Sequence, residues 1–361
     1  MEGDVLEARS NSNAVLNVAL LGYGFAGKTF HAPLLSNVPG LRLSHIVSSD
    51  SAKVRKDWDV TVLPKPEDAF GLQEIDIIVV ATPNPTHFDL ARKALLSDKH
   101  VVVDKPFTNT IAEAQELIAL AKSRGRLLSV FQNRRWDADF LTLRQLISEK
   151  PLGEIVNFES HYDRYRPEPR QRWREQDVPG GGLWFDLGPH LIDQALQLFG
   201  APEGIYADLE IQRPGGQAND YFHILLRYGK RRVILDGGSL VAAETPRFTV
   251  HGTFGSYTKF GMDTQEESLK RGDVPGSPGW GADPRTGTLV TARRGGGFET
   301  RQVPNIPGNY LAYYEAVQRA IATGAPNPVS GEDGLAIINV IETAIKSAAA
   351  RAELPFNEIK L

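Results

Sequence analysis

The chain has 361 residues, of which 41% are hydrophobic and 23% are charged, and its formal net charge is −4 at pH 7. One hydrophobic core rarely serves more than about 250 to 300 residues, so the length predicts two domains. The charge gives no reason to expect a nucleic acid or a membrane as a partner, whereas small neutral or anionic ligands stay open. The chain has no cysteine, which excludes disulfides, thiol nucleophiles and cysteine-ligated metals. We therefore expect no metal site, and chemistry that depends on Lys, His, Asp, Glu or a bound cofactor.

Residues 1–14 are mostly polar and do not resemble a signal peptide. They cannot bury enough apolar surface to offset the cost of ordering, so we expect a disordered lead-in. No stretch of the sequence approaches the roughly 18 apolar residues of a membrane span. A cytoplasmic location is the expectation that follows.

The first domain is expected over residues 15–134, where short apolar runs alternate with helical segments. This alternation is typical of a doubly wound parallel sheet with crossover helices, the α/β class of the Rossmann fold. Thr110 and Glu113 have the spacing of a capping box, which predicts the start of one of the helices. The expected strands are residues 16–21, 41–47, 75–81, 100–103 and 127–131.

The second domain is expected over residues 135–361, where the pattern changes. A helix is predicted over residues 137–149, and from residue 154 apolar residues recur at every second position. Such runs, separated by glycine-bearing turns, predict an α+β domain with a large, mostly antiparallel open sheet. Ser330 is a candidate N-cap for a helix over residues 331–350, which is able to pack back on the first domain.

A glycine-rich loop follows the first expected strand. Gly22, Gly24 and Gly27 have the G-x-G-x-x-G spacing, with Phe25 and Ala26 between the last two, and a helical segment follows. Glycines there permit a tight turn and let a pyrophosphate approach the backbone at a helix N-terminus. The spacing alone is a weak signal, because structural turns in other α/β proteins produce it as well. The preceding strand and the following helix favour a dinucleotide site.

The end of the second expected strand bears on the choice between NADP and NAD. A carboxylate at this position would bind the ribose 2′-hydroxyl and repel a 2′-phosphate. Ser48 and Ser49 stand at the expected strand end and Lys53 follows, which suits a phosphate. Asp50 argues for NAD unless it only caps the next helix. We expect NADP as the cofactor and keep NAD as the alternative.

Three residues are the catalytic candidates. Lys105 follows the fourth expected strand, at the edge where open α/β sheets bind ligands. Asp186 and His190 are four residues apart in a segment of helical spacing, so they share one face. Pro189 fits a helix only in its first turn, which places the expected helix start near Asp186. The structural alternatives are a solvated lysine and a core pair in which the histidine and the aspartate satisfy each other.

Motifs spread over nearly the whole chain, from about residue 15 to 355, resemble one enzyme family. They are GYGFAGKTFHAPLL, VVVDKPFT, FQNRRWDADFLTLRQLI, HYDRYRPEPRQRWRE, FDLGPHLIDQALQLFG, DYFH and WGAD. Together they are similar to the glucose-fructose oxidoreductase and inositol dehydrogenase family. Within it, QNRRWD and the RYRP and RWRE pair resemble the branch of NADP-dependent scyllo-inositol 2-dehydrogenases.

The resemblance implies a Rossmann domain followed by an αβ domain whose sheet mediates a homodimer or a homotetramer. The lysine of the family's E-K-P motif matches Lys105, and its D-x-x-x-H motif matches Asp186 and His190. Asp104 replaces the usual glutamate, which keeps the charge but shortens the reach. Ser49 falls where NAD-dependent members carry an acidic residue, which supports NADP.

The resulting hypothesis is an NAD(P)-dependent oxidoreductase that acts on a secondary alcohol of a cyclic polyol or sugar. His190 takes the hydroxyl proton, Lys105 stabilises the developing alkoxide, and Asp186 orients the imidazole or holds a neighbouring hydroxyl. Further cofactor contacts are expected from Thr82, Pro83, Asn84, His87, Asp104, Asn133 and Arg134. Substrate contacts are expected from Arg164, Tyr165, Arg166, Trp173 and Arg174.

Several alternatives stay open at this point. His87 can instead be a plain helix-cap residue, and some of the arginines can form salt bridges at a subunit contact. A dehydrogenase of another sugar, an aldose or a diol fits the same residues, because such substrates differ only in hydroxyl placement. A non-catalytic NADP-binding sensor on the same fold is the other class, and the retention of Lys105, Asp186 and His190 argues against it.

Overall fold

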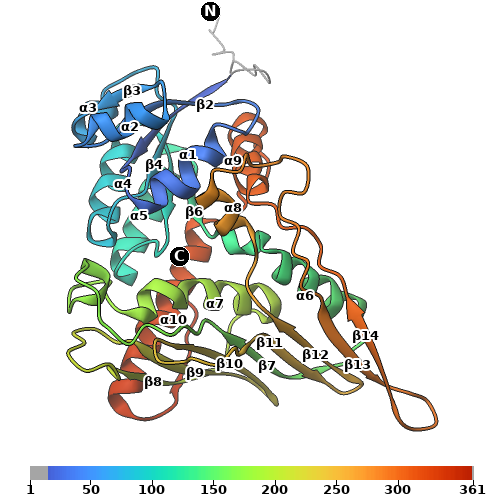
Figure 1. The fold of residues 1–361 in the computed structure, drawn as a ribbon. Helices are drawn as coiled ribbons and strands as arrows, with labels where there is room; N and C mark the ends of the chain where they lie inside the picture. Colours follow the sequence, from blue (N-terminus) through green and yellow to red (C-terminus); the bar gives the residue numbers. More distant parts are fainter. Residues whose placement is uncertain (1–14, 360–361) are drawn as a thin grey trace, which may run out of the picture.

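The computed structural model describes residues 15–359, and the lead-in expected over residues 1–14 therefore lies outside the described residues. Two sheets organise the fold, one in the upper and one in the lower part of Figure 1. We call the part around the upper sheet the first unit and the part around the lower sheet the second unit.

The sheet of the first unit has six strands in the order β3-β2-β1-β4-β5-β6, and all neighbouring strands are parallel. This order reverses between β1 and β4 and is that of a doubly wound dinucleotide-binding domain, which confirms the expected fold class. Only the three-residue edge strand β3 was not expected, because it is too short to show a periodic pattern. The strands are β1 (Leu16–Leu21), β2 (Leu41–Val47), β3 (Thr61–Leu63), β4 (Ile77–Val80), β5 (His100–Asp104) and β6 (Leu128–Phe131).

Helices cover both faces of this sheet. The capping box predicted at Thr110 is confirmed: its hydroxyl accepts the N–H of Glu113 at 3.2 Å, and the Glu113 carboxylate accepts the N–H of Thr110 at 3.1 Å. The helices of this unit are η1 (Gly27–His31), α1 (Ala32–Leu35), α2 (Ser51–Asp57), α3 (Pro66–Phe70), η2 (Asn84–Thr86), α4 (His87–Leu96) and α5 (Ile111–Arg124).

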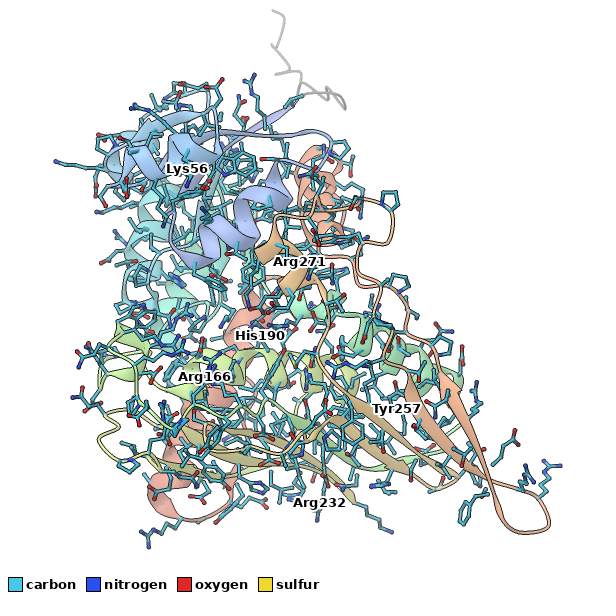
Figure 2. The ribbon with its side chains drawn as sticks, viewed as in Figure 1. Lys56, Arg166, His190, Arg232, Tyr257 and Arg271 are labelled. Carbon is cyan, nitrogen blue, oxygen red and sulfur yellow. The ribbon has the colours of Figure 1, made fainter. Side chains whose placement is uncertain are left out.

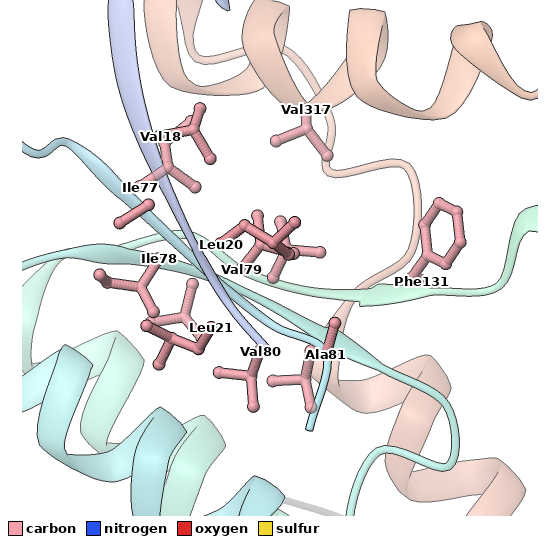
Figure 3. Close-up of a cluster of buried hydrophobic side chains, with 14 of the residues drawn as sticks. Val18, Leu20, Leu21, Ile77, Ile78, Val79, Val80, Ala81, Phe131 and Val317 are labelled. Carbon is pink, nitrogen blue, oxygen red and sulfur yellow. The ribbon is translucent and has the colours of Figure 1, made fainter. Parts of the chain in front are cut away.

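The core of the first unit takes side chains from distant parts of the chain. Every residue of β4 is buried, as expected of a strand that is covered on both faces. Figure 3 shows Val18 and Ile77 of the two central strands on the same side of the sheet as Val317. Val317 belongs to α9 (Leu311–Thr323), which lies far beyond the predicted domain boundary. The last third of the chain therefore completes the core of the first unit.

The sheet of the second unit has nine strands in the order β14-β13-β12-β11-β7-β10-β9-β8-β15. All neighbouring pairs are antiparallel except β7 and β10, which are parallel. This confirms the mostly antiparallel open sheet. The strands are β7 (Ile155–His161), β8 (Gly204–Glu210), β9 (Tyr221–Tyr228), β10 (Arg231–Gly238), β11 (Pro246–Gly252), β12 (Gly255–Phe260), β13 (Gly287–Ala292), β14 (Phe298–Val303) and β15 (Leu354–Pro355).

Helices lie on the face of this sheet that is turned toward the first unit, as Figure 1 shows for α6 and α7. No helix among residues 15–359 covers the opposite face in this view. The remaining helices are η3 (Asn133–Trp136), α6 (Ala138–Glu149), η4 (Trp173–Glu175), α7 (Leu183–Phe199), α8 (Gln265–Arg271) and α10 (Gly331–Ala350).

Helix α7 begins three residues earlier than expected, so Pro189 lies inside the helix rather than in its first turn. The reason is a cap that is distant in sequence. The backbone carbonyl of Asn219 accepts the N–H of Leu183 at 2.7 Å, and its side-chain oxygen accepts the N–H of Trp184 at 2.8 Å. These bonds satisfy N–H groups that the first turn of a helix leaves free.

Helix α10 joins the two units. On one side the carboxylate of Glu342 accepts the N–H of Ile111, at the start of α5, at 2.9 Å. On the other side the hydroxyl of Ser347 accepts the N–H of Ala207, in β8, at 3.0 Å. The predicted cap is present, because the hydroxyl of Ser330 accepts the N–H of Asp333 at 3.1 Å.

Replacing Ser330 with alanine removes this cap, and we expect the free energy of unfolding to fall by about 1 kcal/mol. Thermal unfolding followed by circular dichroism measures the change as a lower Tm. The matched control is Ser123→Ala, which removes an exposed hydroxyl inside α5 that donates to the Leu120 carbonyl. A control that loses as much stability as Ser330→Ala would contradict the role of the cap.

Candidate active site

A cavity of about 750 Å³ lies between the carboxyl ends of the first sheet and the second unit. It sits where the strand order reverses, the usual ligand site of open α/β sheets. Figure 2 shows His190 at mid-height, between the two units. The predicted site residues that line the cavity are Gly24, Phe25, Ala26, Thr82, Pro83, Asn84, Asp104, Lys105, Asn133, Arg134, Arg164, Arg166, Trp173, Arg174, Asp186 and His190.

The glycine loop fits a dinucleotide. Gly22 has φ +98°, a conformation that side chains rarely adopt, and a Cβ on Gly27 would lie 2.1 Å from the Gly22 carbonyl oxygen. These two glycines are therefore required by the turn and by the close packing of the helix on the strand. A Cβ on Gly24 would meet nothing within 4 Å. Gly24 lines the cavity, so its bare backbone leaves room for a phosphate to approach.

The predicted 2′-phosphate residues lie at the end of β2, outside the lining of the cavity. The carboxylate of Asp50 accepts the N–H of Lys53 at 2.9 Å and caps α2. This is the structural role that the sequence left open for Asp50. The ammonium of Lys53 donates to the Tyr23 carbonyl at 2.9 Å, and the hydroxyl of Ser48 accepts the N–H of Asp50 at 3.1 Å. Ser49 is exposed beside them.

Seven predicted site residues do not line the cavity: Gly22, Gly27, Ser48, Ser49 and Lys53, described above, and also His87 and Tyr165. His87 is the first residue of α4 and is fully buried. Its Nδ1 lies 2.8 Å from the Pro106 carbonyl and its Nε2 lies 2.9 Å from the Thr82 carbonyl. The imidazole therefore ties together the loops that follow β4 and β5, below the cavity floor. Tyr165 is 60% exposed and forms an isolated bridge with Leu240.

Lys105 forms a buried ion pair with Asp186, so it is not a solvated lysine. Its Nζ donates to the Asp186 backbone carbonyl at 2.5 Å and lies 3.4 Å from the carboxylate. Each side chain is 13% exposed. Burial lowers the pKa of Lys105 below its ordinary value, while Asp186 opposes this shift. The pair links the end of β5 in the first unit to α7 in the second.

Asp186 is surrounded by cations. Besides Lys105, the guanidinium groups of Arg174 and Arg164 lie 3.4 Å and 3.9 Å from its carboxylate. Burial raises the pKa of Asp186, but the three cations outweigh it and hold the pKa well below its ordinary range. Within residues 15–359 the carboxylate makes no hydrogen bond to His190. Its geometry therefore serves to hold Lys105 rather than to orient the imidazole.

His190 is buried on the same face of α7, and within the described part of the chain its Nδ1 has no hydrogen-bond partner. Burial lowers its pKa well below 6.5, and Lys105, Arg134 and other nearby cations lower it further. The imidazole is therefore neutral at pH 7 and able to accept a proton. It does not form the core pair with Asp186 that was the structural alternative.

Tyr162 also lines the cavity and was not among the residues predicted there. Its ring meets His190 edge to face with centroids 6.2 Å apart, and its buried hydroxyl has no partner within residues 15–359. The guanidinium of Arg134 lies 5.3 Å from the ring centroid. Tyr162 stands just after β7 among charged residues, where nothing in the pattern distinguishes it from a core tyrosine.

Helix α8 is the other element that the sequence did not reveal at the site. It brings Glu266 and Lys270 to the cavity. Arg134 donates to Glu266 at 2.7 Å and to Asp137 at 3.3 Å, so part of its charge is already paired. The segment QEESLKR is short and polar, and its position depends on tertiary contacts such as the hydrogen bond from Gln265 to the Trp136 carbonyl.

Residues 15–359 contain no group of three or more His, Cys, Asp or Glu side chains that could hold a metal ion. The same residues also contain no helix with the length and apolar character needed to cross a membrane.

Comparison with known proteins agrees with this geometry. Residues 16–132 match the family model described as "Oxidoreductase family, NAD-binding Rossmann fold". Residues 144–356 match the model described as "Oxidoreductase family, C-terminal alpha/beta domain". The fold and the glycine loop thus define a two-unit NAD(P)-binding oxidoreductase. The chain belongs to the Gfo/Idh/MocA family, named for glucose-fructose oxidoreductase and inositol dehydrogenase.

Individual relatives cover almost the whole chain. The Escherichia coli protein YdgJ, named as an uncharacterized oxidoreductase, is 53% identical over 340 residues, 94% of this chain and 98% of YdgJ. IolW of Bacillus subtilis, named as an NADP-dependent scyllo-inositol 2-dehydrogenase, is 41% identical over 92% of this chain and 94% of IolW. The solved structure of YPO2259 from Yersinia pestis has a TM-score of 0.93 at 50% identity, covering 96% of this chain and 99% of that one.

Replacing Gly27 or Gly24 with alanine is expected to have two different effects. Gly27→Ala should lower the free energy of unfolding by about 1–3 kcal/mol, because its Cβ would collide with a backbone carbonyl. Gly24→Ala should keep the Tm of the wild type but raise the Kd for NADPH at least about tenfold, because the methyl group fills the approach to the backbone. Thermal unfolding and a fluorescence titration with NADPH measure the two effects. Unchanged NADPH binding by Gly24→Ala would contradict the proposed approach of the cofactor phosphate to the glycine loop.

Proposed function

We propose that this protein is an NADP-dependent oxidoreductase that interconverts a secondary alcohol of a cyclic polyol or sugar with the corresponding ketone. The observation that carries the proposal is one cavity that contains Gly24, the ion pair of Lys105 with Asp186, and His190, whose Nδ1 has no partner within residues 15–359. The name of IolW supports scyllo-inositol as the first substrate to examine. A dehydrogenase of another sugar, an aldose or a diol remains the alternative.

The residues of the cavity have distinct roles in this proposal. When bound, the nicotinamide would accept hydride from the alcohol carbon or return it to the ketone. His190 accepts the hydroxyl proton, for which its neutral imidazole suits it. The ammonium of Lys105 stabilises the negative charge that develops on the same oxygen. Asp186 keeps this ammonium in place and charged, through the contacts at 2.5 Å and 3.4 Å.

Two observations support NADP over NAD. One oxygen of the Asp50 carboxylate caps α2, which gives this residue a structural role. The exposed Ser49 and the ammonium of Lys53 stand beside it, and both are suited to a phosphate. The printed name of IolW, which specifies NADP, points the same way.

A homodimer or homotetramer through the second sheet is part of the proposal. Its open face carries a row of half-exposed apolar side chains, because Tyr206 pairs with Leu225 and Leu225 pairs with Ile234. Apolar rows of this kind on an uncovered face are typical of subunit contacts.

The first prediction of this proposal concerns activity. Formation of the reduced cofactor, followed by absorbance with scyllo-inositol, myo-inositol and glucose, should be faster with NADP than with NAD. His190→Ala should lower kcat about 10²–10⁴-fold, the usual contribution of a general base. The matched control is His251→Ala, which changes an exposed histidine of β11 and should keep the wild-type rate.

The outcomes separate the candidate functions. Tight NADPH binding without turnover of any alcohol would favour the non-catalytic sensor and contradict the proposed activity. Equal loss of activity in His190→Ala and His251→Ala would mean that the substitutions act on folding or assembly, and not on proton transfer.

The second prediction concerns the pH dependence of kcat/KM for alcohol oxidation. Because the pKa of His190 lies well below 6.5, the rate should stay level down to pH 6.5 and fall only below it. Because the pKa of Lys105 lies below 10.5, the rate should fall again as the pH rises through that lowered value. Lys105→Arg should remove the alkaline limb and keep the acid limb. An alkaline limb that persists in Lys105→Arg would contradict this assignment.

A further inference from the structure

The cavity carries an excess of positive charge, although the chain as a whole is negative. Eight cationic side chains and four carboxylates line it, against a formal charge of −4 for the full chain. The carboxylates are Asp104, Asp163, Asp186 and Glu266. The cations are Lys105, Arg134, Arg164, Arg166, Arg170, Arg172, Arg174 and Lys270.

The carboxylates are already engaged by other groups. Asp186 is shared by Lys105, Arg164 and Arg174, and Glu266 is shared by Arg134 and Lys270. The other two carboxylates also have hydrogen-bond partners. Asp163 accepts hydrogen bonds from the Gly238 N–H at 3.0 Å and the Thr245 hydroxyl at 2.8 Å, and Asp104 accepts the Lys105 N–H at 2.8 Å.

Arg166 and Arg170 are two cations of the cavity that these four carboxylates do not pair with. Both lie in the segment between β7 and η4, and Figure 2 labels Arg166 there. Within residues 15–359, neither guanidinium group makes an ion pair or a hydrogen bond. Arg172, in the same segment, donates to Glu175 at 2.8 Å.

Like charges crowd this segment. Burial lowers the pKa of Arg166, and the neighbouring Arg170 and Arg172 lower it further. Burial likewise lowers the pKa of Arg164 to about 10, with Arg166 and Arg172 adding to the shift. A group of guanidinium groups that destabilise one another is stabilised by a bound anion, and carboxylate and phosphate match their planar donors.

We propose that the substrate carries an anionic group, a carboxylate or a phosphate, which binds Arg166 and Arg170 while the reacting alcohol lies at Lys105 and His190. This inference rests on the proposed oxidoreductase function and narrows its substrate from a neutral polyol to an acidic or phosphorylated one. The cofactor does not account for these arginines, because its phosphates are expected at Gly24, in the first unit.

The test compares neutral substrates with their anionic counterparts. Initial rates with NADP are measured for myo-inositol against myo-inositol 1-phosphate and for glucose against glucuronate, so the two pairs distinguish phosphate from carboxylate. We expect kcat/KM for at least one anion to exceed that of its neutral counterpart about tenfold or more. The KM of the anion should rise with added salt, whereas the KM of the neutral counterpart should not.

The double variant Arg166→Gln and Arg170→Gln should bring the ratio of anion to neutral substrate close to one and leave the Kd for NADPH unchanged. Arg319→Gln, at an exposed position of α9, is the matched control and should keep the wild-type ratio. If neutral polyols react as well as both anions and no salt effect is seen, the proposal of an anionic substrate is overturned. The proposed oxidoreductase function is not affected by that result. A higher Kd for NADPH in the double variant would mean that the two arginines bind the cofactor, and this result would also overturn the proposed anionic substrate. An enzyme that binds NADPH but oxidises neither kind of substrate would instead contradict the oxidoreductase function.

Discussion

The buried ion pair between Lys105 and Asp186 is the contact on which the site depends. Its two members come from different units, one from the loop after β5 and the other from α7, so the pair fixes how the first sheet faces the helix of the second unit. Loss of one partner of such a pair leaves an uncompensated buried charge, which typically costs about 3–5 kcal/mol. The same contact therefore links the two units at the site and keeps the ammonium at the cavity.

The cations around this pair act in opposite ways on two residues that are one helical turn apart. They stabilise the charged form of Asp186 and destabilise the charged form of His190, so both pKa values lie below their ordinary values. The outcome is an ionised carboxylate and a neutral imidazole in one cavity at neutral pH. The acid–base character of the two groups is thus set by burial and by the nearby cations, Lys105 first, rather than by a hydrogen bond between the two side chains.

Sequence patterns predicted those elements of the fold that are determined by residues close together in the chain. Buried strands such as β4 and the caps at Thr110 and Ser330 have patterns that are visible within a few residues. Helix α7 was placed three residues too late, because its cap, Asn219, is distant in the chain. Strand β14 was not found, because five of its six residues are exposed and show no alternation.

The candidate site divides in the same way. The glycine loop and the motif spacing predicted Gly24, Lys105, Asp186 and His190 as site residues, and the structure brings these four to one cavity because each follows a strand end or shares a helix face. Tyr162 and the residues of α8 could not be predicted, because only tertiary packing brings them there. The burial of the His87 imidazole beneath the floor likewise depends on two carbonyls from separate loops.

The packing of α9 on the first sheet has a consequence for how the protein is made. Tyr313, Tyr314 and Val317 belong to the same buried core as β1 and β4, yet they are synthesised more than 230 residues later. A nascent chain that has released only its first sheet from the ribosome still exposes the apolar surface that these side chains cover. The first unit therefore reaches its native core only when the chain is almost complete.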